Sequence, residues 1–208
     1  MKVKMNTITA DKKIYKAIVA FQTNKIQSAN LIFKNLIKTH PKYAPVHYNA
    51  GVFYKNIGKF AKAISLFETT INLEKNYTNA YFELGSIYFK NNQLDKAENI
   101  YLKILKLQNN NNKEVLFILG EIYQKKNNFN KAITYYRKCL SIDQNDTKTI
   151  INLGYCYQQT DKEKKAIAQY RMAYHANNNI FFHIMKMMVS GKKGFLFLKP
   201  IELKKLLS

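Results

Sequence analysis

The chain has 208 residues, 47% of them hydrophobic, and a formal net charge of +21. Its length allows one or two globular domains. No apolar run reaches the roughly 18 residues that a membrane span needs, and the N-terminus lacks the apolar core of a secretory signal. We therefore expect no membrane span, and a cytoplasmic protein.

The positive charge comes almost entirely from lysine. The chain holds 32 Lys, 24 Asn and only two Arg, Arg137 and Arg171. Nucleic-acid readout favours the planar guanidinium of Arg, whereas Lys and Asn share A-rich codons, so an AT-rich genome accounts for much of the charge. We favour solvated Lys faces over a nucleic-acid stripe, although phosphate affinity itself needs only positive charge. The same field would steer an acidic partner.

The chain begins with a predicted N-terminal tail, residues 1–9, and a weakly patterned segment, residues 10–43. Ala17 and Ala20 stand in this segment where later copies have Gly and Tyr. Only the back half of the recurring pattern is kept, as Ala29, Phe33, Leu36 and Pro41. We count 10–43 as a degenerate first copy of the repeat that follows.

The segment 44–77 carries the full pattern, which returns 34 residues later in 78–112. Within 78–107, apolar and small residues recur at steps of three and four, which predicts one face of two successive helices joined by a polar turn at 90–95. Two more copies follow at 113–146 and 147–180, after one additional residue in the run Asn109–Asn112. The markers are Gly51, Tyr54, Ala63 and Phe67; Gly85, Tyr88, Ala97 and Tyr101; Gly120, Tyr123, Ala132 and Tyr136; and Gly154, Tyr157, Ala166 and Tyr170.

Each of the four glycines falls in the middle of a predicted helix. Glycine costs about 1 kcal/mol relative to Ala at such a position. A cost that recurs in every copy indicates that a side chain of a neighbouring helix packs against each Gly, where any Cβ would clash.

The last segment, residues 181–208, is predicted to cap the repeats with a helix and a tail. The helix is expected to stop at Gly191, and a final short helix to begin at Pro200. We expect this segment to fold back on the last repeat, which would make Met185, Met187, Met188, Phe195 and Phe197 core residues; a docking peptide for another protein is the alternative.

This pattern resembles the tetratricopeptide repeat family, whose 34-residue unit is a helix–turn–helix with a small residue at position 8, an aromatic at 11 and Ala at 20. The resemblance covers about 170 of the 208 residues. It departs from the family at position 4, where Trp is replaced, for example by His47, and near position 32, where only Pro41 keeps the family's Pro. The resemblance implies an all-α, right-handed superhelical solenoid of about five helix–turn–helix units with a C-terminal capping segment, which we expect to form a single elongated domain.

In this family, positions 2, 5, 9 and 12 of the first helix line a concave groove that binds peptides or helices. Carried onto this chain, the groove residues are Tyr48, Val52, Lys55, Asn79, Phe82, Ser86, Phe89, Phe117, Glu121, Gln124, Lys148, Ile151, Tyr155 and Gln158. An open row of large apolar side chains at position 5 predicts a binding surface. The alternative is that neighbouring helices or the C-terminal tail cover part of it.

Catalysis and metal binding find no support in the sequence. The four His are scattered, no Gly-rich phosphate loop is present, and no acidic pair is placed for acid–base chemistry. We expect no cofactor, no metal site and no catalytic residue. Cys139 and Cys156 have no metal-ligand spacing and are predicted to be buried free thiols.

The leading hypothesis is a non-enzymatic adaptor or scaffold that binds a segment of a partner protein in the groove, with aromatic anchors and amide side chains such as Gln124. A bacterial secretion chaperone is a variant of this hypothesis. The second hypothesis is a nucleic-acid-binding protein driven by Lys, whose affinity would fall steeply with salt. A third is head-to-tail self-association of an open-ended solenoid.

Overall fold

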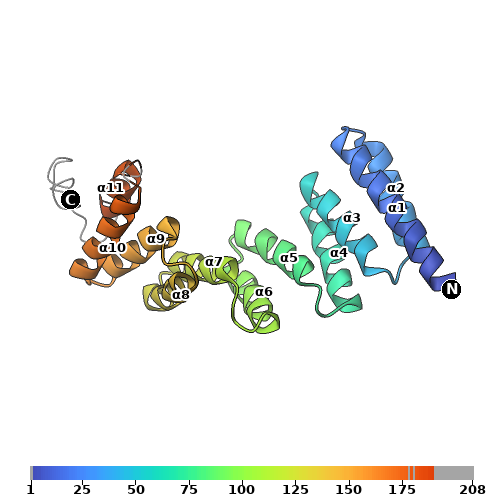
Figure 1. Ribbon diagram of the computed structural model, residues 1–208. Helices are drawn as coiled ribbons and strands as arrows, with labels where there is room; N and C mark the ends of the chain where they lie inside the picture. Colours follow the sequence, from blue (N-terminus) through green and yellow to red (C-terminus); the bar gives the residue numbers. More distant parts are fainter. Residues whose placement is uncertain (1, 178, 180, 190–208) are drawn as a thin grey trace. The chain divides into compact units, whose positions relative to one another are not determined.

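The computed structural model describes residues 2–177, 179 and 181–189, and within them it consists of α-helices joined by short turns (Figure 1). This confirms the all-α class. The helices are α1 (Lys2–Gln22), α2 (Ile26–Thr39), α3 (Ala44–Asn56), α4 (Phe60–Leu73), α5 (Thr78–Lys90), α6 (Leu94–Leu107), α7 (Lys113–Lys125), α8 (Phe129–Ile142), α9 (Thr147–Gln159), α10 (Glu163–Ala176) and α11 (Phe181–Val189).

Each predicted repeat is one antiparallel helix pair. The pairs are α1 with α2, α3 with α4, α5 with α6, α7 with α8, and α9 with α10, and the two helices of each pair pack against each other. Odd-numbered helices from α1 to α9 are therefore the first helices of their repeats, and even-numbered helices are the second. The helix–turn–helix units predicted from the 34-residue period are confirmed.

The chain forms two compact units, which we call the N-terminal half (Met1–Leu107) and the C-terminal half (Gln108–Ser208). This differs from the single elongated domain expected from the repeats. The division falls beside the run Asn109–Asn112, where the sequence carries its additional residue. Asn109 and Asn110 there both adopt left-handed backbone conformations, with φ of 52° and 60°.

The turn inside every repeat contains one residue in the left-handed region. This conformation lets the chain leave the first helix and reverse within a few residues, and Gly, Asn and Asp adopt it at the lowest cost. The five residues, at the same place in each repeat, are Asn24, Gly58, Asn92, Asn127 and Asp161. The degenerate first repeat is thus regular in its turn, although it lacks the Gly and Tyr markers.

The helical glycines pack against an aromatic ring of their own repeat, as predicted. An ideal Cβ on Gly51 would lie 2.7 Å from the Phe67 ring, and one on Gly85 would lie 3.0 Å from the Tyr101 ring. Gly120 and Gly154 face Tyr136 and Tyr170 in the same way. All four rings are fully buried. The second helix can approach the first closely only because the side chain of residue 8 is missing.

The N-terminal end of the repeat array differs from the sequence prediction. Residues 2–9 were expected to be a tail, but α1 begins at Lys2. The segment contains neither Gly nor Pro, so nothing interrupts the helix, and Ala10 is fully buried.

At the other end, α11 packs on α9 and α10, as α3 packs on α1 and α2. It thus takes the place of the first helix of a further repeat. Ile184 of α11 is fully buried in an apolar cluster that includes Tyr157 and Tyr170, and Met185 packs against this cluster. The side chains of Met187 and Met188, and all of Phe195 and Phe197, lie outside the described residues.

Candidate functional site

The predicted groove residues occupy one side of the first helices of their repeats. Positions 2, 5, 9 and 12 follow one another at steps of three and four, so they share one helical face. We call this side the groove face. Its residues on α3 and α5 belong to the N-terminal half, and those on α7 and α9 belong to the C-terminal half.

On the groove face of the N-terminal half, Tyr48 lies between two other aromatic rings. Its ring centroid is 5.0 Å from that of Tyr77 and 6.0 Å from that of Phe67. Burial, and to a lesser extent the nearby Glu83 carboxylate, raise the pKa of Tyr48. Tyr48 is half-buried, so one part of the ring packs on its own repeat and the other part remains accessible.

The groove face of the N-terminal half also carries Lys55 of α3 and Phe82 of α5. Phe82 is half-buried and packs edge-on against Tyr101, with centroids 5.8 Å apart. Lys55 of α3 donates to Glu83 of α5 at 2.5 Å, and both side chains are about three-quarters buried. This ion pair joins two successive first helices. Ser86 and Phe89 are half-buried and Asn79 is exposed.

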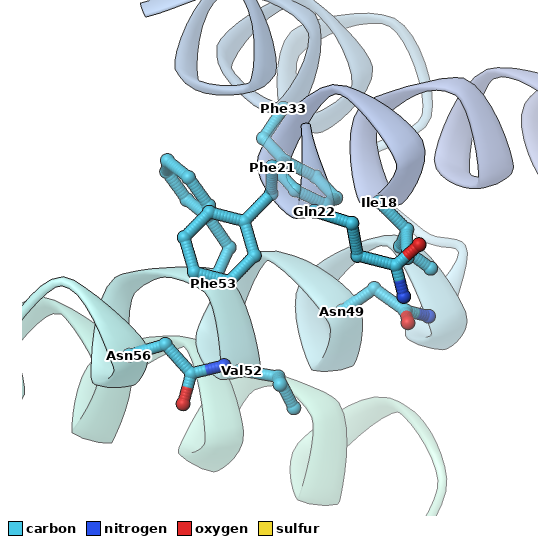
Figure 2. A pocket seen from close by; sticks show the side chains of 8 residues that line it. All are labelled: Ile18, Phe21, Gln22, Phe33, Asn49, Val52, Phe53 and Asn56. Atoms are coloured by element: carbon cyan, nitrogen blue, oxygen red, sulfur yellow. The ribbon is translucent and has the colours of Figure 1, made fainter. Parts of the chain in front are cut away.

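A pocket of about 250 Å³ opens between α1, α2 and α3 (Figure 2). Its walls are mostly apolar, and the edge of the Phe21 ring meets the Phe53 ring at 5.5 Å. In Figure 2, the amides of Gln22 and Asn49 lie near each other to the right of these rings, and Asn56 lies below the rings. The full lining is Ile18, Phe21, Gln22, Phe33, Asn49, Val52, Phe53 and Asn56.

Of these eight residues, only Val52 is among the groove residues predicted from the sequence. Ile18 and Phe21 hold positions 9 and 12 of the first repeat, which are groove positions in the later repeats. They were missed because 10–43 was treated as degenerate and its groove positions were not carried over. Continuing the 34-residue register upstream would have found both residues.

The groove face of the C-terminal half carries charge over its aromatic ring. Lys148 of α9 lies 4.2 Å from the centroid of Phe117 on α7. Its Nζ is also 3.7 Å from a carboxylate oxygen of Glu121. Burial raises the pKa of Glu121, and Lys148 opposes this shift. Phe117, half-buried against Tyr136, is thus covered by a cation on its other side.

The glutamines at position 12 are bonded to the tyrosines of their own repeats. The Tyr136 hydroxyl donates to Gln124 Oε1 at 2.9 Å, and the Tyr170 hydroxyl donates to Gln158 Oε1 at 3.0 Å. These two bonds link the first helix to the second within each repeat. The carbonyl oxygens of both amides therefore already have a structural role.

Two predicted groove residues are buried in the C-terminal half. Ile151 is 3% exposed and Gln158 is 5% exposed. Ile151 belongs to the same apolar cluster as Ile184 of α11, so the α11 side of the repeat is closed. Tyr155 is half-buried and packs near Phe129. The structure thus brings Phe117, Glu121 and Lys148 together, but it removes Ile151 from the accessible surface.

Among the residues that the structure describes, no group of three His, Cys, Asp or Glu is arranged to hold a metal ion. Cys139 and Cys156 are free and buried, as predicted. Burial raises the pKa of the Cys156 thiol to about 12, which makes it a poor nucleophile. No described helix combines the length and apolar character needed to cross a bilayer.

Two family models, both of the tetratricopeptide repeat, match the chain, one over residues 58–116 and one over residues 113–146. A sequence comparison with curated proteins finds no match. The matched segments include the complete repeats that carry Phe82 and Phe117.

Solved structures with the same fold are similar over most of the chain. A crystal structure of MamA protein has a TM-score of 0.73 and 20% identity, covering 83% of this chain and 93% of that one. MamA from Desulfovibrio magneticus RS-1 has a TM-score of 0.72 and 17% identity, covering 82% and 96%. YrrB, described as a TPR protein with an unusual peptide-binding site, has a TM-score of 0.65 and 16% identity, covering 84% and 90%. At these identities the similarity concerns the fold.

Proposed function

The chain is a tetratricopeptide repeat protein, and from this premise we propose that it is a non-enzymatic adaptor that binds a segment of a partner protein on its groove face. The observation that carries the proposal is the pocket between α1, α2 and α3, which continues the groove positions of α3 into the first repeat. A cytoplasmic location is part of the proposal.

The size and lining of this pocket favour a polypeptide over a metabolite. Its volume of about 250 Å³ is below the roughly 300–1,000 Å³ typical of small-molecule sites, so it suits one or two side chains. Phe21, Phe33 and Phe53 offer apolar contact, while the surrounding amides can bond a peptide backbone. No Lys or acidic residue belongs to the lining, although the chain is strongly basic. An apolar, uncharged side chain of the partner is therefore the best occupant.

The peptide-binding site named for YrrB supports the proposal by analogy of fold only. The groove face of the C-terminal half would contribute Phe117 and the Glu121–Lys148 pair to a partner segment. The other proposed contacts are Tyr48, Lys55, Asn79, Phe82, Ser86 and Phe89 in the N-terminal half, and Tyr155 in the C-terminal half.

The test is affinity purification of the tagged protein from its native cells, with and without nuclease, followed by mass spectrometry. The pocket variant is Ile18→Asp/Val52→Asp, which puts carboxylates at two half-buried wall positions. The control is Leu31→Asp/Leu102→Asp, because Leu31 is 70% and Leu102 is 36% exposed and neither lines the pocket.

We expect a partner protein that the wild type and the control retain at fixed stoichiometry after nuclease, and that the pocket variant loses. Circular dichroism must show that the pocket variant remains folded. Retention by all three proteins would overturn the pocket assignment. Loss of all co-purifying material on nuclease treatment would favour the nucleic-acid hypothesis instead.

A further inference from the structure

In each of the four complete repeats, the lysine at residue 19 lies over the ring of a tyrosine in the same repeat. We call these four residues the lysine ladder. Their Nζ atoms lie 3.9 Å (Lys62 over Tyr54), 5.3 Å (Lys96 over Tyr88), 4.8 Å (Lys131 over Tyr123) and 5.8 Å (Lys165 over Tyr157) from the ring centroids. In the register of the repeat, the lysine is always residue 19 and the tyrosine is always residue 11.

The ladder lies beside the turns inside the repeats, and none of its residues is one of the predicted groove residues. Each tyrosine belongs to the last turns of a first helix, and each lysine belongs to the first turn of the second helix. Lys62 and Lys96 are in the N-terminal half, and Lys131 and Lys165 are in the C-terminal half. The degenerate first repeat has Ala20 and Ser28 at these two positions and therefore lacks a rung.

The ladder lysines are accessible and are not used by internal ion pairs. All four are exposed. Within the part of the chain that the structure describes, none of them has a carboxylate partner. The tyrosines beneath them are buried, with 1–9% of their surface exposed. Each ammonium group thus lies over a ring face while the lysine side chain stays exposed to water.

We propose that in each half the two ladder lysines form a docking site for an acidic polypeptide segment, and that none of these lysines is one of the predicted groove residues. A lysine already held against a ring loses less side-chain freedom when it binds a carboxylate, which lowers the entropic cost of association. Each half offers such a lysine at the same place in two successive repeats, so a segment with several carboxylates can engage both rungs of one half.

The surroundings of the ladder favour carboxylates over nucleic acid. Single-stranded nucleic acid gains affinity by stacking bases on aromatic faces, but these tyrosine rings are buried beneath the lysines. No rung is an Arg, the residue that binds phosphate in a bidentate manner.

The test measures binding of a fluorescently labelled 16-residue glutamate-rich peptide to the full chain by fluorescence anisotropy at low salt. The ladder variant is K62Q/K96Q/K131Q/K165Q. The matched control is K34Q/K38Q/K103Q/K106Q, which removes the same charge from four exposed lysines of the second helices α2 and α6. We expect the ladder variant to bind at least tenfold more weakly than the wild type, and the control to change less than threefold.

A third variant with Arg at the four ladder positions separates charge from packing, because Arg keeps the cation over the ring. We expect it to bind as the wild type does. Equal losses in the ladder variant and the control would overturn the proposal, since they would show only an effect of net charge. No binding by the wild type would overturn it as well.

A 16-nucleotide oligothymidylate and vesicles with anionic lipid are measured in parallel. Tighter, ladder-dependent binding of either probe would overturn the assignment to an acidic polypeptide. The Ile18→Asp/Val52→Asp variant should bind the glutamate-rich peptide like the wild type. The ladder can thus fail or succeed independently of the proposed groove function.

Discussion

The groove faces of the two halves share one register but present different chemistry. In the N-terminal half, the face includes an apolar pocket between α1 and α3, and its ion pair, Lys55 with Glu83, is short and largely buried. In the C-terminal half, the ion pair of Lys148 with Glu121 is longer, at 3.7 Å, and Lys148 is largely exposed. The repeat therefore determines where side chains point, while their identity determines whether a site is apolar or charged.

The same comparison holds for position 12. Lys55 at this position bonds to the next first helix, whereas Gln124 and Gln158 bond to tyrosines of their own repeats. In the N-terminal half, the polar side chain of Lys55 thus joins two successive repeats. In the C-terminal half, the polar side chains of Gln124 and Gln158 join the two helices of one repeat. Four predictions test how far the two halves differ in stability and in the titration of their side chains.

The largest expected effect compares Gly120→Ala with Gly85→Ala. A Cβ on Gly120 would overlap the fully buried Tyr136 ring more severely than a Cβ on Gly85 would overlap Tyr101. Overpacking costs about 1–3 kcal/mol, and Ala regains about 1 kcal/mol of helix propensity. We expect Gly120→Ala to lower the free energy of unfolding by about 2 kcal/mol and Gly85→Ala by less than about 1 kcal/mol, measured by urea unfolding.

Thiol labelling gives a local readout of that prediction, because both cysteines, Cys139 and Cys156, belong to the C-terminal half. Gly120→Ala should let them react at lower urea concentrations. Equal destabilisation by the two substitutions would show that the contact with the ring does not set the cost.

The second prediction concerns the tyrosine–glutamine bonds of the C-terminal half. Tyr170→Phe removes the donor to Gln158 and leaves a buried amide oxygen without it, so we expect a loss of about 1 kcal/mol. Tyr136→Phe, which removes the donor to Gln124, should cause a similar loss of stability. The matched control in the N-terminal half is Tyr81→Phe. Tyr81 is also buried, and its hydroxyl has no hydrogen-bond partner among the residues that the structure describes. We expect almost no change in stability for this variant. Thermal unfolding measures all three, and an equal loss in the control would contradict the role of the bonds.

The third prediction is that replacing the glutamate by glutamine changes the stability at pH 7 in opposite directions in the two ion pairs. Burial raises the pKa of Glu121 in the folded protein, so the folded state holds the proton more tightly than the unfolded state. The stability contribution of this group therefore falls as pH rises from the unfolded value, about 4.3, through the raised folded value. Glu121→Gln should stabilise the protein at pH 7 by less than about 1 kcal/mol, and the gain should vanish near pH 4.

Glu83→Gln is the matched change in the N-terminal half. It weakens the short pair with Lys55 and leaves a largely buried ammonium group, so it should destabilise the protein at pH 7. Unfolding curves at pH 4 and pH 7 test both variants. The comparison fails if both substitutions change stability in the same direction at pH 7.

The smallest expected effect concerns Lys113 at the start of α7. Its hydrogen bond to Asp143 at 2.7 Å lowers the pKa of that carboxyl. The corresponding residue in the N-terminal half is Thr78. Lys113→Thr should therefore raise the pKa of Asp143 towards its ordinary value, which a carboxyl NMR titration measures. An unchanged titration would show that the backbone bond from Asn145, the second cause of the shift, is sufficient.

Local features of the fold were predictable because they recur. The 34-residue period located the helix pairs, and the mid-helix glycines predicted close packing against another helix, which the rings of Phe67, Tyr101, Tyr136 and Tyr170 provide. The thiols of Cys139 and Cys156 were predicted to be buried and free, and they are. Each of these features depends on contacts within one repeat or between adjacent helices, so the sequence spacing is enough to infer it.

The candidate site was predictable only in part. The register placed Phe82 and Phe117 at the same position of their first helices, but it could not show that Lys148 lies over the Phe117 ring or that Ile151 is buried. The pocket residues Ile18 and Phe21 lay in a repeat without the marker glycine. Whether a groove position stays open depends on the neighbouring helix, which the register of a single repeat does not describe.

The sequence by itself determined the all-α class, the helix pairs and the side of each first helix that carries the groove positions, because these follow from helical periodicity and the 34-residue repeat. The tertiary structure alone decided the division into two halves, the helical start of the chain at Lys2, and which groove positions remain accessible. It also decided that every ladder lysine lies over a tyrosine. Burial and ion pairing are properties of neighbours in space, and side chains that are far apart in the chain become neighbours only when the helices pack.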